Sequence, residues 1–200
     1  MLRRALRCTP ALALCASAFV AGCGKDNKAA DSARVADSIA AATPAPAPAP
    51  APPTLTDANI AAILDGANAT DSSAGAVAVA KGTSADIKSF AKDMMRDHHA
   101  LRKAGQDLVK KLNVTPELPA GDNSAATAAA WMDTLNATAK GADFDKKYIE
   151  HEVAYHTAVL ATAQAALGAA QNQELKDLIT KAAPNIQAHL DHAKSIAGKM

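Results

Sequence analysis

The segment of residues 87–108 constrains the possible fold more than any other part of the sequence. Its apolar residues recur at steps of three and four, the spacing of one face of an α-helix: Ile87, Phe90, Met94, Leu101, Ala104 and Leu108. Asp97 falls in a gap of this apolar stripe, and His98 lies beside it. Because a buried polar group without a partner costs roughly 1–3 kcal/mol, these side chains need polar partners on other helices. The segment therefore predicts a bundle of helices with polar residues in its core.

Four long segments of the chain have helical spacing and recognisable end signals. They cover residues 57–82, 83–113, 143–167 and 172–197, with Gly82 and Gly168 as stop signals and Asp143 as a cap. A shorter helical segment, residues 124–140, follows Pro116 and Pro119 in the long connection between the second and third segments. Only 3% of the residues are aromatic, so small aliphatic side chains must build the core. The sequence predicts an all-α, ferritin-like four-helix bundle with a long crossover that carries a short extra helix.

Polar residues interrupt the apolar stripe of every long segment. The candidate metal ligands, or residues that support them, are His98, His156, His189, Asp97, Glu152 and Asp71. Three histidines on three helices exceed what packing requires, and neutral imidazoles with one or two carboxylates suit Zn(II), Cu(II), Mn(II) or Fe(II). The alternative is a hydrogen-bonded polar layer in which carboxylates hold imidazoles in one tautomer, as part of a structural or interaction module.

The sequence does not indicate an enzyme. No Glu-x-x-His occurs, which argues against the di-iron site of classical ferroxidases, and no nucleotide loop or nucleophile motif is present. An oxidoreductase would need open coordination positions or a substrate pocket, and no sequence feature shows either. No catalytic residue is therefore assigned, and a metal-buffering or metal-sensing role is expected if the metal site forms.

Residues 1–54 are expected to direct the export of the chain and to tether the domain to a membrane. Three arginines precede an apolar run from Ala11 to Val20, as in a secretory signal peptide, and residues 20–23 (Val-Ala-Gly-Cys) are similar to a bacterial lipobox. The prediction is a signal peptide over residues 1–22, lipidation of Cys23, a Pro/Ala-rich tether over 23–54 and the bundle over 55–200. The alternative is cleavage after residues 16–18 (Ala-Ser-Ala), which leaves a free Cys23. Lipidation would attach the protein to the bacterial cell envelope, facing the periplasm, with the outer membrane as the expected location.

The charge of the chain argues against a nucleic-acid partner. Residues 1–22 contain three of the 21 basic residues and none of the 20 acidic residues, so 18 basic and 20 acidic residues remain after cleavage. A nearly neutral protein without a cluster of lysine or arginine, and with few aromatic residues for stacking on bases, lacks the features of a nucleic-acid binder. The expected partners are the membrane, through Cys23, and a metal ion.

Three short motifs occur in order along the long helical segments: Phe90-Ala91-x-x-Met94-x-x-Asp97-His98, Phe144-Asp145-x-x-Tyr148 with His156, and Pro184 with His189-Leu190. They resemble the motifs of a known bacterial family, domain of unknown function 4142, whose ferritin-like members are often labelled outer-membrane proteins. The resemblance covers residues 57–200 and implies the bundle fold, export and no assigned activity. The family usually has a glutamate four residues before a glycine on the first helix, where this chain has Asp71 before Gly75. Met95-x-x-His98-His99 is also similar to a short motif of another four-helix family, which is associated with copper.

Overall fold

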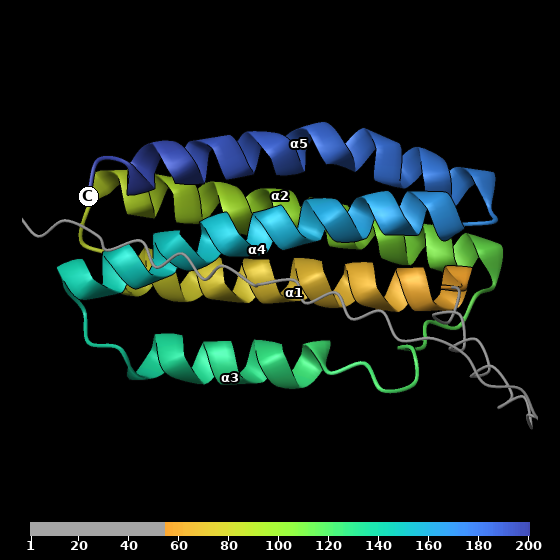
Figure 1. The fold of residues 1–200 in the computed structure, drawn as a ribbon, viewed down its shortest axis with the longest axis horizontal. Helices are drawn as coiled ribbons and strands as arrows, with labels where there is room; N and C mark the ends of the chain where they lie inside the picture. The colour runs from red at the N-terminus through yellow and green to blue at the C-terminus, as the bar shows by residue number, and fades with distance from the viewer. Residues whose placement is uncertain (1–54) are drawn as a thin grey trace, which may run out of the picture. The chain divides into compact units, whose positions relative to one another are not determined.

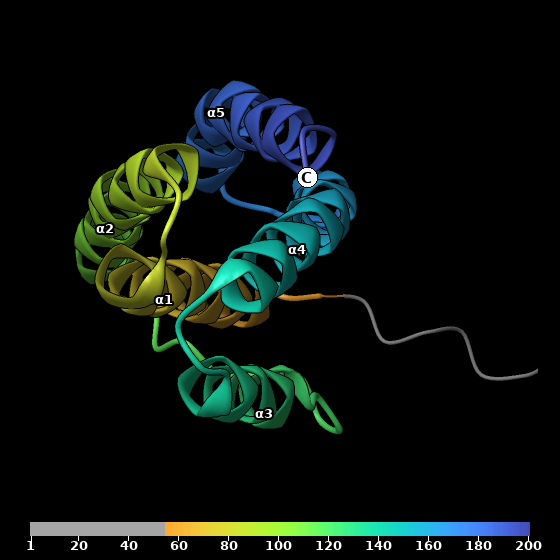
Figure 2. The ribbon, with the colours of Figure 1, turned by 90° about the vertical axis from the view of Figure 1, so that its left-hand side faces the viewer.

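A computed structural model of the chain describes residues 55–200. This part contains five helices and no strand: α1 (Asp57–Lys81), α2 (Ala85–Leu112), α3 (Ser124–Ala137), α4 (Ala142–Ala169) and α5 (Gln173–Ala197). The four long helices pack side by side, and α3 lies outside them against α1 and α4 (Figures 1 and 2). The all-helical prediction is confirmed. The predicted signal peptide and tether lie outside the described residues and stay predictions.

Most helix ends lie where the sequence predicts them. Thr56 caps α1 in a capping box with Asn59, Ser84 caps α2, and Asn172 caps α5, each by accepting backbone N–H groups of the first turn. Gly82 ends α1 as expected. In residues 55–200, no helix is apolar over a long enough stretch to cross a membrane.

Two predicted ends of α4 are wrong, and tertiary contacts explain one of them. Asp143 does not cap the helix, whose N-cap is Gly141. Gly168 does not stop it either, because the helix continues to Ala169. The chain leaves the helix where the Asp57 carboxylate, from the start of α1, accepts the backbone N–H groups of Gln171 and Asn172 at 2.8 and 3.0 Å. The short helix α3 also ends early, at Ala137 rather than near residue 140.

A buried carboxylate joins the turn between α1 and α2 to α4. Asp145 is 2% exposed and accepts hydrogen bonds from the Thr83 backbone N–H (2.9 Å), the Thr83 hydroxyl (2.5 Å) and the Ser84 backbone N–H (2.8 Å). These donors precede the first turn of α2, where backbone N–H groups lack partners within the helix. Asp145 therefore fixes the start of α2 relative to α4, the helices that carry two of the candidate histidines.

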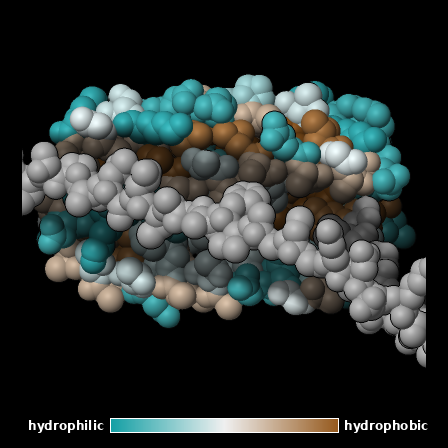
Figure 3. Space-filling model, in the orientation of Figure 1, coloured by the Kyte–Doolittle hydropathy of each residue, from teal (hydrophilic) through white to brown (hydrophobic). Residues whose placement is uncertain are grey.

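The core consists of two apolar clusters with a polar layer between them. One cluster includes Phe90, Met94, Phe144, Tyr148 and Ile196, and the other includes Ile60, Ala163, Ala166, Leu175 and Ile179. On the long helices, five of the six buried polar residues fall between the two clusters: Asp71, His98, Glu152, His156 and His189. Two residues of the predicted apolar stripe of α2 lie outside both clusters, because Leu101 is half-buried and Ala104 is exposed. Figure 3 shows hydrophobic residues on one face of the bundle, directly below the hydrophilic residues of its upper edge.

We expect Gly75→Ala to lower the free energy of unfolding by about 1–3 kcal/mol, because the added methyl group would overpack a close helix contact. A Cβ at Gly75 would lie 2.8 Å from the Ala91 carbonyl oxygen and 3.0 Å from Met95 Cγ. Urea denaturation measures the change. Gly66→Ala on the same helix is the control, since its Cβ would meet no atom within 4 Å. Equal stability of the two variants would contradict the close packing of α1 on α2.

Candidate metal centre

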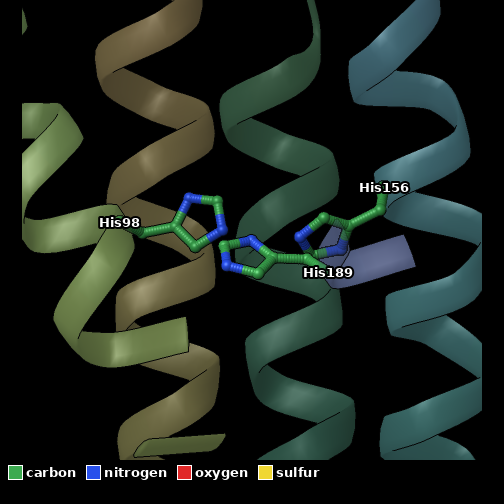
Figure 4. A group of neighbouring side chains, drawn as sticks. All are labelled: His98, His156 and His189. Atoms are coloured by element: carbon green, nitrogen blue, oxygen red, sulfur yellow. The ribbon is translucent and has the colours of Figure 1, made fainter. Parts of the chain in front are cut away.

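Three buried imidazoles from three helices meet in the polar layer. His98 of α2, His156 of α4 and His189 of α5 are 2%, 0% and 8% exposed, and their rings point toward one another in Figure 4. One nitrogen of each lies within 4.8 Å of one nitrogen of each of the others. The ring centroids are 5.3 to 5.5 Å apart. Three imidazoles bound tetrahedrally at about 2.0–2.1 Å would have centroids roughly 5 Å apart, so the arrangement fits one shared ion.

Hydrogen bonds fix which nitrogen of His98 carries the proton. The Asn68 side-chain amide donates through Nδ2 to the Leu64 carbonyl oxygen at 2.7 Å, which leaves Asn68 Oδ1 as an acceptor. His98 Nδ1 lies 2.8 Å from that oxygen and must therefore donate to it. The lone pair of neutral His98 is consequently on Nε2.

The tautomers of the other two histidines follow from acceptors that cannot donate. His156 Nδ1 donates to the Glu152 backbone carbonyl at 3.0 Å, and His189 Nε2 donates to Asp97 Oδ2 at 3.0 Å. Hydrogen bonds from the Arg96 guanidinium lower the pKa of Asp97, which keeps this carboxylate an acceptor. The lone pairs are therefore on His156 Nε2 and His189 Nδ1.

These three nitrogens and one carboxylate oxygen share a buried space in which they have no hydrogen-bond partner among the described residues. His98 Nε2, His156 Nε2, His189 Nδ1 and Asp71 Oδ2 are all buried, and none has a hydrogen-bond partner among residues 55–200. Asp71 Oδ2 lies 3.2 Å from His98 Nε2 and 3.8 Å from His156 Nε2. Burial lowers the pKa of His98 to about 3 and also lowers the pKa of His189, so both rings are neutral near pH 7. Facing lone pairs repel one another unless a proton or a metal ion lies between them.

Two buried carboxyl groups adjoin the imidazoles. Ligand atoms of Asp71, Glu152 and His156 lie within 4.8 Å of one another. Burial, followed by the charge of Glu152, raises the pKa of Asp71 well above its ordinary range, and burial raises the pKa of Glu152 to about 8. Burial also raises the pKa of Tyr148, whose hydroxyl has no hydrogen-bond partner among the described residues. Without a cation, the carboxyl groups hold protons that a bound metal ion would displace.

The structure brings five of the six predicted residues into the buried layer and places Asp97 at its edge. The Asp97 side chain is 25% exposed and binds Arg96 and His189, so it orients an imidazole and does not face the shared space. His99 and His192 are exposed, while His151 is half-buried and its ring stacks on that of Trp131, with the ring centroids 3.6 Å apart. Asn68 was not among the residues predicted for the site. Its position three residues before Asp71 places it on the same face of α1, which would have indicated it.

Comparisons with known proteins give a family and a fold. No curated protein matches the chain. The crystal structure of a DUF305 fragment from Deinococcus radiodurans is similar with a TM-score of 0.62, over 74% of this chain and 100% of that one, at 12% identity. At that identity the likeness shows the fold alone. A family model, domain of unknown function (DUF4142), matches residues 41–196, which include all five helices except the last residue of α5. The chain belongs to the DUF4142 family.

Proposed function

We propose that the domain binds one transition metal ion in the polar layer of the bundle. The ligands are His98 Nε2, His156 Nε2, His189 Nδ1 and Asp71 Oδ2. The observation that carries the proposal is the convergence of these four buried atoms, none of which has a hydrogen-bond partner among residues 55–200. A polar layer that served packing alone would be expected to pair such atoms with donors.

The hydrogen-bond acceptors of the three imidazole rings support the same proposal. The nitrogen of each ring that faces away from the shared space donates to a fixed acceptor: Asn68 Oδ1, the Glu152 carbonyl or Asp97 Oδ2. Metal-binding histidines in proteins have this arrangement, because the second hydrogen bond sets the tautomer and orients the ring. Three nitrogens and one oxygen suit Zn(II), Cu(II), Mn(II) or Fe(II), so the proposed role is buffering or sensing of a transition metal.

The proposal predicts one metal ion per chain. The full-length chain, treated with chelator and then offered Zn(II), Cu(II), Mn(II) or Fe(II) separately, is expected to retain one equivalent of at least one of them after desalting. Elemental analysis measures the content, and titration calorimetry measures the affinity. If no metal is retained above trace levels, the polar layer is structural and the domain is a structural or interaction module.

We also propose that the bundle is ferritin-like and lipid-anchored in the bacterial envelope. The long connection between α2 and α4 supports the ferritin-like arrangement, since such folds have one long crossover. The lipobox-like residues 20–23 and the Pro/Ala-rich residues that follow support an anchor and a spacer, with the periplasmic side of the outer membrane as the proposed location.

Intact mass tests the anchor. The chain expressed in a bacterial host is expected to lose residues 1–22 and to gain diacylglycerol on Cys23. Cys23→Ser should abolish the lipid mass and move the protein to the soluble fraction. A Cys23→Ser variant that keeps the lipid and stays with the membranes would contradict the proposal.

A further inference from the structure

A cavity of about 370 Å³ adjoins the proposed metal centre. Asp71, His98 and Asn68 line one end of it, and its walls are apolar, formed among others by Leu64, Leu101, Val159 and Ile186. Binding sites for small molecules have volumes of roughly 300–1,000 Å³ and combine apolar walls with a few polar groups. The cavity therefore has the size and the composition of a ligand site, and two of the proposed metal ligands face it.

The polar residues at the rim of the cavity do not offer a free charge. Arg102 binds both carboxylate oxygens of Asp65, at 2.9 and 3.1 Å, and Gln106 donates to the same carboxylate at 2.8 Å. Arg102 and Asp65 therefore compensate each other. A metal ion on His98 and Asp71 would instead place a Lewis acid at the buried end of the cavity, to which a carboxylate oxygen of a ligand can bind.

We propose that the cavity binds an aliphatic monocarboxylate of medium chain length, with its chain along the apolar walls and its carboxylate on the metal ion as a fifth ligand. This inference rests on the proposed metal site. The polar side chains at the rim, Asp65, Arg102 and Gln106, bind one another. The buried end beside His98 and Asp71 therefore accounts for one polar group on the ligand. The apolar walls account for an aliphatic chain, and the limited volume excludes a ligand as large as a phospholipid.

The test uses the full-length chain loaded with Co(II), whose visible absorption changes when a new group enters the coordination sphere. Elemental analysis first establishes one Co(II) per chain. Decanoate is expected to bind at least a hundredfold more tightly than acetate, because burial of only about four of its additional methylene groups would give that ratio, and to change the Co(II) spectrum.

A pair of glycine variants tests the cavity itself. Gly105 lines the cavity, and a Cβ there meets no atom within 4 Å, so Gly105→Leu can extend into the space. It is expected to weaken decanoate binding by roughly tenfold or more and to leave acetate binding and Co(II) content unchanged. Gly168→Leu is the control, since a Cβ there also meets no atom within 4 Å and the residue does not line the cavity.

The outcomes separate the two proposals. A chain that binds no Co(II) or other transition metal overturns the metal site and this inference with it. A chain with one Co(II) that binds acetate and decanoate equally, or whose spectrum decanoate does not change, overturns this inference alone. Unchanged decanoate binding in Gly105→Leu also overturns it.

Discussion

Replacing His156 with alanine is expected to weaken metal binding by more than about a hundredfold. Loss of a residue that only orients a metal ligand costs 10–100-fold in affinity, so loss of a ligand should cost more. His156 is fully buried. One of its ring nitrogens lies within 4.8 Å of a nitrogen of His98 and of a nitrogen of His189, and its Nε2 lies 3.8 Å from Asp71 Oδ2. Titration calorimetry on chelator-treated full-length chain measures the change.

A neighbouring histidine on the same helix provides the control. His151 stacks on Trp131 and lies outside the cluster of ligand atoms, so His151→Ala should bind metal as the original chain does. Circular dichroism checks that both variants are folded. If His156→Ala does not fold, His189→Ala replaces it, because His189 lies nearer the surface. Metal binding by a folded His156→Ala or His189→Ala variant with unchanged affinity would leave only the structural interpretation of the polar layer.

The metal-free chain is expected to lose about 2 kcal/mol of unfolding free energy between pH 6.5 and pH 8, because Glu152 is buried. Folded Glu152 keeps its proton up to a pKa of about 8, whereas the ordinary value is 4.5. Between these values the folded protein binds more protons than the unfolded chain, so its stability falls as the pH rises. The raised pKa of Asp71 acts in the same direction.

The lowered pKa of His98 restricts this loss of unfolding free energy to pH values above about 6.5. The pKa of His98 is lowered from 6.5 to about 3, so between these values the unfolded chain binds more protons and stability rises with pH. The two effects oppose each other below pH 6.5. Above pH 6.5 the carboxyl effect remains, and the contribution of Glu152 to it ends near pH 8.

Urea denaturation at several pH values measures this dependence. Glu152→Gln should flatten the curve above pH 6.5, whereas Glu150→Gln, at an exposed position of the same helix, should not. One equivalent of bound metal should also flatten it, since the ion stabilises the charged carboxylate. Constant stability of the metal-free chain from pH 6.5 to 8 would contradict a buried, protonated Glu152.

The helices could be predicted because their signals are local. Thr56, Ser84 and Asn172 cap the helices that they precede, and apolar spacing identifies the long segments. The end of α4 could not be predicted, because Asp57, 114 residues before Gln171 in the sequence, binds the backbone there. Gly168 is tolerated inside the helix at a cost of about 1 kcal/mol, so the residue type alone did not determine the end.

The candidate site was predictable in its residues but not in its chemistry. Histidines on apolar stripes indicated a polar layer, but Asp97 and His98 are neighbours, and only the packed structure shows that His98 faces the core while Asp97 lies at the edge. Which ring nitrogen of His98 has the lone pair is determined by the hydrogen bond to Asn68, a residue of another helix. The cavity beside Asp71 and His98 likewise arises from several helices and has no signature in the sequence.

X-ray absorption spectroscopy of the zinc-loaded full-length chain tests the central claim most directly. We expect a four-coordinate ion with three imidazole nitrogens at about 2.0–2.1 Å and one carboxylate oxygen at about 2.0–2.2 Å, with the multiple-scattering features of imidazole rings. His156→Ala should remove one imidazole from this shell. A shell of oxygen atoms without imidazole scattering, at one zinc ion per chain, would contradict a metal centre built from His98, His156 and His189.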